Sequence, residues 1–189
     1  MLDEKQKQLT RKVISGLIAQ RKIVKPERGR SYFFLEKSKD SFLLAKRILE
    51  IADDPTEQLK SYAWVVCIAY YSMFFAATAL LAHFMHKIDG EQGIHKLTSH
   101  ALLYYFILDD NKLQKHFIEE YQDTYKEAEQ LLQLSEQKAL EMVQDFDFEQ
   151  QKRKIFTYEM GKIAEQQKAR TSLQRAENFL MEVRKIIEA

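Results

Sequence analysis

The residues of this sequence best suited to chemistry are histidines that stand close to lysines and arginines. His95 comes two residues after Gly93 and directly before Lys96. Cleavage of RNA without a metal ion needs a group that takes the 2′-hydroxyl proton, a group that protonates the leaving oxygen, and a cation beside the phosphate. Histidine exchanges protons near neutral pH, and lysine and arginine bind phosphate. His95, Lys96 and Arg153 are therefore candidates for these roles.

Lys96 and His100 form a second candidate site, for binding rather than catalysis. They are four residues apart and would share one face of a helix, from which both side chains reach one phosphate group. Two structural interpretations stand beside these functional ones. His95 can serve as a cap of this helix, and Lys96 and His100 can form an ordinary face exposed to solvent.

The histidines near the middle of the chain also raise the question of a metal site. His83 and His86 are three residues apart, and Asp89, His95 and His100 follow soon after. Zinc sites often combine histidine with cysteine, and no cysteine lies among these residues. The sequence also contains no glycine-rich phosphate loop and no HExxH, GxSxG or CxxC motif. We therefore expect neither a metal ion nor another cofactor.

The composition predicts an all-α fold. With only 5 glycines and 2 prolines among 189 residues, turns are few, whereas residues that favour helices dominate. The length fits a single domain. The formal net charge is +1, so no overall field attracts a polyanion and any RNA contact would be local. The lone cysteine, Cys67, lies in an apolar run and is expected to be a small core residue of a chain in a reducing cytoplasm.

Hydrophobic periodicity divides the chain into helices. Apolar or small residues recur at spacings of three and four from Leu35 to Ala52, which predicts a helix over about 30–52. Asp54 and Pro55 fit the start of the next helix. The further helices are expected over about 61–86, 95–108, 113–142 and 173–187. The chain should therefore form an up-and-down helical bundle of four to five main helices over residues 30–189, preceded by an N-terminal helical extension over residues 1–29.

The segment between Lys60 and Lys87 contains no Asp, Glu, Lys or Arg and is long enough to cross a bilayer. Cysteine, tyrosine, serine, threonine and histidine interrupt it, however, and the amphipathic helices around it need an apolar partner. We interpret it as the buried central helix of the bundle, with no membrane contact. The N-terminus has no apolar signal core, so we expect no export and a cytoplasmic location.

Part of this segment resembles a known family. AYYSMFFAATALLA (69–82) is similar to the AYYAMFHAA-type central helix of bacterial and archaeal HEPN domains. YFFLEKSKDSFLLAKRILE resembles the opening helix of the family and GIHKLTSHALLYYF its helix after the loop. RKIFTY and RAENFLMEVRKII resemble its last two elements. The resemblance covers about residues 30–189.

The resemblance implies a bundle of four or five helices that often pairs as a homodimer, and in many members a metal-independent ribonuclease or a toxin paired with a nucleotidyltransferase. It places His95 in an IHK pattern and matches Arg153 and Tyr158 to the R-to-Y pattern of one subgroup. Arginine would clamp phosphate there, and tyrosine would offer a hydroxyl or a stacking face; the alternative is structural anchoring. The family's ribonuclease signature, arginine followed after four to six residues by histidine, is absent. Whether the chain is an enzyme therefore stays open.

We expect a HEPN-type protein of a prokaryotic toxin–antitoxin or nucleotidyltransferase-linked system, which forms a homodimer and binds RNA, a nucleotide or a partner protein. One alternative is a divergent metal-independent ribonuclease that cuts single-stranded RNA with His95 and Lys96, Arg153 or Tyr158. Another alternative is a purely structural interaction module.

Overall fold

The computed structural model describes residues 4–58, 60–90, 93–109, 112–144 and 166–189. They form six α-helices, a π-helical turn and two strands of two residues each. In chain order these are α1 (Glu4–Ala19), β1 (Ile23–Val24), α2 (Arg30–Asp53), α3 (Tyr62–His83), β2 (Lys87–Ile88), α4 (Ile94–Leu103), η1 (Tyr104–Asp109), α5 (Lys115–Gln144) and α7 (Gln166–Glu188). The expected all-α helical bundle is confirmed.

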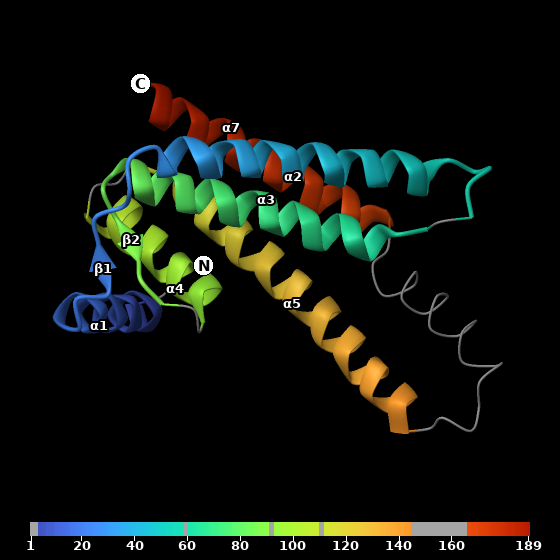
Figure 1. Ribbon diagram of the computed structural model, residues 1–189, viewed down its shortest axis with the longest axis horizontal. Coiled ribbons are helices and arrows are strands. Elements are labelled where there is room, and N and C mark those ends of the chain that lie inside the picture. The colour runs from blue at the N-terminus through green and yellow to red at the C-terminus, as the bar shows by residue number, and fades with distance from the viewer. Residues whose placement is uncertain (1–3, 59, 91–92, 110–111, 145–165) are drawn as a thin grey trace.

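Helices α2, α3 and α7 lie along the length of the molecule, and α5 crosses them at an angle (Figure 1). Ser38 and Ser72 join α2 to α3, because each hydroxyl donates to the backbone carbonyl of the other residue, at 2.8 and 2.9 Å. Ala45 and Ala76 lie on the same helical faces as these serines and are fully buried. Small side chains therefore let the two backbones approach closely.

Helix α3 is the central helix of the bundle and is apolar on all sides. Its length and hydropathy would allow it to cross a membrane, yet 72% of its most apolar 18-residue window is buried inside the protein. Helices α2, α4, α5 and α7 all pack against it. Packing within the bundle therefore accounts for its sequence without Asp, Glu, Lys or Arg.

The start of α3 differs from the expectation. We expected Asp54 and Pro55 to begin this helix, but it begins at Tyr62. Asp54 instead caps the C-terminus of α2, and its carboxylate accepts hydrogen bonds from the backbone N–H and the hydroxyl of Thr56 at 2.8 and 2.7 Å. Aspartate side chains often form such local turns, which compete with a helix.

The helix expected over 95–108 is α-helical only within α4 and continues as the π-helical turn η1. A π-helical turn is wider than an α-helical one and shifts the register of the residues in it. Phe106 is buried, with its ring 5.3 Å from that of Phe84, whereas Tyr105 stacks on His86 with ring centroids 3.8 Å apart. Both rings thus find partners on the segment that follows α3.

Helix α1 packs against α4 and η1. Ile14 and Thr10 on its inner face are fully buried. The Thr10 hydroxyl lies 2.9 Å from His100 Nδ1, and β1 pairs antiparallel with β2, where Ile23 is opposite Ile88. Apolar burial, one side-chain hydrogen bond and a short strand pair therefore hold the N-terminal extension to the bundle.

Candidate functional site

His95 lies just inside α4, which follows Gly93 in the left-handed conformation (φ 72°). Its side chain is half-buried among aromatic rings of α3 and α5. His95 Nδ1 lies 2.7 Å from the hydroxyl oxygen of Tyr70. The imidazole centroid is 4.3 Å from that of Phe74 and 6.4 Å from the nearly parallel ring of Tyr125. Two neighbouring helices thus fix both the position and the orientation of the imidazole.

Burial sets the protonation states of this cluster. Burial lowers the pKa of His95, and the charge of Glu129 offsets only part of this, so the imidazole is neutral at pH 7. Burial raises the pKa of Tyr70 well above its usual range. Burial and the hydrogen bond that Tyr125 donates to Glu129, 2.8 Å long, raise the pKa of Tyr125 to about 12. Both phenols therefore keep their protons.

This arrangement limits the chemistry of His95. When the Tyr70 phenol donates to Nδ1, the neutral imidazole carries its own proton on Nε2. In that tautomer Nε2 is a hydrogen-bond donor and cannot take a 2′-hydroxyl proton. The rings that contact His95 are those of Tyr70, Tyr71, Phe74 and Tyr125. The geometry is that of a histidine packed in an aromatic core.

Of the other predicted site residues, Lys96 and His100 are described, and they do not join the aromatic cluster around His95. Lys96 is exposed on α4, whereas the half-buried His100 contacts Thr10 of α1. Burial, and to a lesser degree the charge of Lys96, lowers the pKa of His100. A neutral His100 adds no charge to phosphate binding. Arg153 and Tyr158 lie outside the described residues, so their roles stay predictions.

The zinc alternative finds no geometric support in the part of the chain that is described. No group of three His, Cys, Asp or Glu side chains there is arranged to hold a metal ion. His83 packs edge-on against Phe84, with ring centroids 5.1 Å apart, and His86 stacks on Tyr105. These two histidines close the end of α3 by ring packing.

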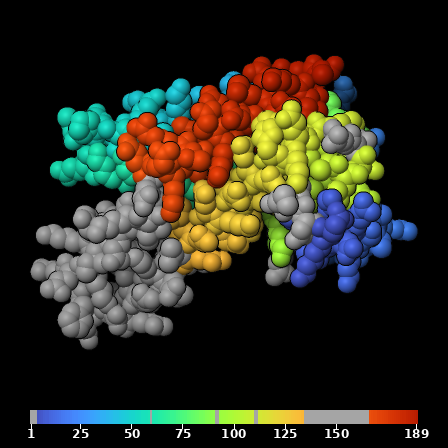
Figure 2. Space-filling model, turned by 180° about the vertical axis from the view of Figure 1, so that it is seen from behind, coloured from blue at the N-terminus to red at the C-terminus, as the bar shows by residue number. Residues whose placement is uncertain are grey.

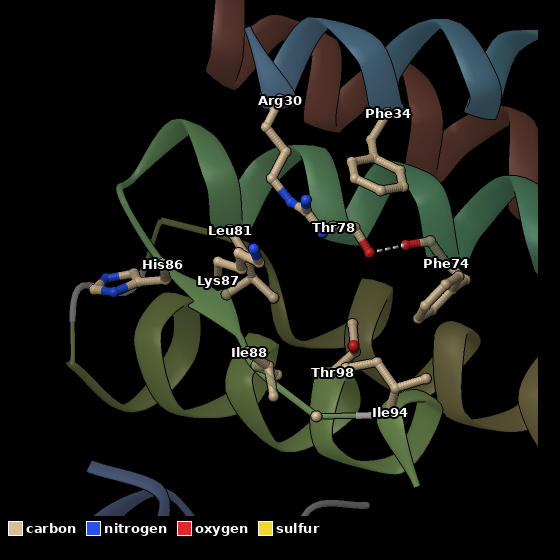
Figure 3. Close-up of a pocket in the computed structure, with 11 residues that line it drawn as sticks. Arg30, Phe34, Phe74, Thr78, Leu81, His86, Lys87, Ile88, Ile94 and Thr98 are labelled. Atoms are coloured by element: carbon tan, nitrogen blue, oxygen red, sulfur yellow. Dashed lines mark hydrogen bonds between the residues drawn. The ribbon is translucent and has the colours of Figure 1, made fainter. Parts of the chain in front are cut away.

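A cavity of about 140 Å³ lies between α2, α3, β2 and α4 (Figure 3). Arg30 and Lys87 bring positive charge to its edge, and Thr78 and Thr98 bring hydroxyls. Apolar side chains form most of the remaining wall: Phe34, Phe74, Leu81, Ile88 and Ile94. Phe74 also contacts the His95 ring, so the cavity and the aromatic cluster share a wall. Cationic, polar and apolar groups thus converge on one small space.

Sequence reasoning missed this cavity. Arg30 follows Gly29, and Lys87 ends the segment without Asp, Glu, Lys or Arg, but the two are far apart in the chain and their positions alone do not bring them together. No family model matches this chain, and neither a search of curated proteins nor a search of solved structures finds a significant match. Its function must therefore be inferred from its own surfaces and sites.

Proposed function

We propose that the chain is a non-catalytic HEPN-type binding protein of a prokaryotic toxin–antitoxin or nucleotidyltransferase-linked system, and that it forms a homodimer through one face of α2 and α3. The observation that carries the dimer is a set of apolar side chains on this face, which includes four aromatic rings in contact with one another. The resemblance of residues 69–82 to the HEPN central helix suggests the class of system.

The row of rings crosses from α2 to α3. Phe33 packs edge-on against Phe34, which stacks on Phe75, which in turn contacts Tyr71, with centroid separations of 5.2, 5.9 and 6.1 Å. The α3 members recur at spacings of four, three and four residues, and therefore share one helical stripe. We call the following residues the α2–α3 face: Phe33, Phe34, Leu44, Trp64, Ile68, Tyr71 and Phe75.

The α2–α3 face is open to solvent. Phe33, Leu44 and Trp64 are exposed by 57%, 52% and 56%. Helix α7 packs against the other side: it lies behind α2 and α3 in Figure 1 and in front in Figure 2, which shows the molecule from behind. Contiguous exposed apolar side chains usually mark an interaction surface. The face is therefore suited to a protein partner.

The charges on α2 favour a second copy of the chain as that partner. If two α2 helices pack antiparallel about a twofold axis between residues 38 and 39, Phe33 of each copy lies opposite Leu44 of the other. The exposed Lys37 then lies opposite Asp40. A twofold axis repeats each pair, so one chain supplies both the apolar and the charged complement.

Light scattering coupled to size-exclusion chromatography tests the dimer. Leu44→Glu places a charge in the α2–α3 face and should convert the dimer to a monomer, because burial of an unpaired carboxylate is costly. Leu43→Glu is the matched control: Leu43 is exposed by 51% but points to the other flank of α2, and its variant should remain dimeric. A monomeric wild type, or a dimer that Leu44→Glu leaves intact, would refute the proposal.

The ribonuclease alternative needs its own experiment. We expect the wild-type chain to leave single-stranded RNA intact in the presence of EDTA, because His95 is neutral and its Nδ1 is held by Tyr70. Cleavage by the wild type that disappears in His95→Ala, while the oligomeric state is unchanged, would show that the protein is an enzyme.

A further inference from the structure

The cavity edge carries two cations that share one carboxylate. Glu27 accepts a hydrogen bond from Lys87 Nζ at 2.6 Å and another from Arg30 Nη1 at 3.1 Å. The hydrogen bond from Lys87, with the charge of Arg30 as a smaller contribution, lowers the pKa of Glu27 to about 2. One positive charge of this triad remains uncompensated. The two cations thus form a site that binds a carboxylate. In this structure the exposed side chain of Glu27 supplies that carboxylate.

The α4 side of the cavity carries an unused hydroxyl. Thr98 is only 2% exposed, its side chain points into the cavity (Figure 3), and within the described residues it makes no hydrogen bond. Thr78, by contrast, donates to the backbone carbonyl of Phe74 at 2.9 Å. The Thr98 hydroxyl therefore faces the open space of the cavity, where a polar group of a ligand can form a hydrogen bond with it.

The volume limits the ligand to about one ring. The cavity measures about 140 Å³, and an apolar protein cavity of about 150 Å³ holds one benzene molecule. Pockets for larger organic ligands have volumes of about 300 Å³ or more. Phe34 and Phe74 line the cavity with aromatic side chains against which an aromatic ligand can pack, and Arg30 lies over the Phe34 ring, 4.9 Å from its centroid.

We propose that this cavity binds a small aromatic carboxylate with a hydrogen-bonding group opposite the carboxylate. The ring packs against the cavity wall that includes Phe34 and Phe74, the ligand carboxylate replaces that of Glu27 on the two cations, and the polar group meets the Thr98 hydroxyl. The cavity shares Phe34 with the α2–α3 face, but the ligand proposal rests on the two cations and Thr98 and does not depend on the dimer.

Isothermal titration calorimetry of the full chain tests the ligand class with benzoate, 4-hydroxybenzoate and inorganic phosphate. We expect both aromatic carboxylates to bind, and 4-hydroxybenzoate to bind about 2- to 12-fold more tightly, the effect of one hydrogen bond. Phosphate fills only the site formed by the two cations and should bind more weakly than benzoate. Absence of benzoate binding, or tighter binding of phosphate, would overturn the proposal.

Four variants test the geometry. Arg30→Ala should weaken benzoate binding by about tenfold or more, because it removes a charge-assisted hydrogen bond. Arg47→Ala removes a similar pair with Glu50, 3.0 Å long on the same helix, and should leave binding unchanged. Glu27→Gln should tighten benzoate binding, because the internal competitor loses its charge. Thr98→Val keeps the side-chain shape and should remove only the preference for 4-hydroxybenzoate.

Three results of these titrations would overturn the proposal. They are equal affinity for benzoate in Arg30→Ala and wild type, no gain in Glu27→Gln, and a preference for 4-hydroxybenzoate that survives Thr98→Val. Circular dichroism of each variant confirms that it is folded. Thr98→Val keeps the shape of a side chain that is only 2% exposed, so this variant should fold as the wild type does.

Discussion

Tyr70 and Tyr121 allow the hydrogen bond to His95 to be measured with an internal control. Their buried rings are 5.9 Å apart in one cluster. The Tyr70 hydroxyl is bonded to His95 Nδ1, whereas the buried Tyr121 hydroxyl makes no hydrogen bond of ordinary length in the described part of the chain and has the Tyr70 phenol as its polar neighbour. Each Tyr→Phe substitution removes one hydroxyl and keeps the ring. Both substitutions remove the interaction between the two phenols, so a difference between the variants reports the hydrogen bond to His95.

The two substitutions should have opposite effects on the free energy of unfolding. Tyr70→Phe loses a hydrogen bond and leaves Nδ1 unpaired, which should cost about 1–2 kcal/mol. Tyr121→Phe removes a hydroxyl whose unpaired burial itself costs about 1–3 kcal/mol, so the variant should be neutral or more stable. A change of about 1 kcal/mol shifts the Tm of a chain of this length by about 2–4 °C.

Urea unfolding followed by circular dichroism measures both values, provided that the m value is unchanged. Nitrogen chemical shifts of His95 add a local readout, because Tyr70→Phe should disturb the imidazole tautomer and Tyr121→Phe should not. Equal destabilisation by the two substitutions would refute the reasoning, since it would mean that the Tyr121 hydroxyl is bonded as well.

Three further predictions concern protonation, reactivity and packing. Burial lowers the pKa of His86, His95 and His100 below the usual 6.5, so the unfolded chain binds more protons than the folded chain between the two pKa values. The free energy of unfolding should therefore fall as the pH drops from about 7 to 5, and urea midpoints that rise on acidification would contradict this. Burial raises the pKa of Cys67 to about 11, so a thiol reagent should modify the native chain far more slowly than the chain in urea. Ala76→Leu should lower the free energy of unfolding by about 1–3 kcal/mol, because the fully buried site has no room for a larger side chain; an unchanged urea midpoint would show that the bundle can open there.

Much of the fold followed from local sequence pattern. The helix expected over 30–52 is observed as Arg30–Asp53, and the central helix expected over 61–86 as Tyr62–His83. The first expectation rests on the spacing of apolar residues, which a helix converts directly into a face, and the second on a long segment without Asp, Glu, Lys or Arg. The exceptions are side-chain effects: the Asp54 turn and the π-helical turn after α4 depend on individual hydrogen bonds and ring contacts that periodicity does not encode.

The candidate site was predicted less well. His95 was singled out for its chemistry, but Tyr70 was placed only within the expected central helix, and its bond to Nδ1 was not foreseen. Glu27 lies in the turn before α2, Arg30 begins α2 and Lys87 lies in β2, so no spacing rule connects all three. Ion pairs and cavities arise from the way helices pack, which depends on contacts distant in sequence.

The residues around His95 separate what the sequence determined from what only the tertiary structure decided. Sequence alone determined that Phe74 and Tyr70 lie on a central apolar helix and that His95 begins a later one, because helical periodicity is local along the chain. Only the tertiary structure decided that the α4 histidine packs into the α3 and α5 rings, where burial lowers its pKa and Tyr70 occupies its Nδ1. It alone also decided that a cavity opens on the other side of Phe74, since the arrangement of α2, α3, β2 and α4 leaves that space unfilled.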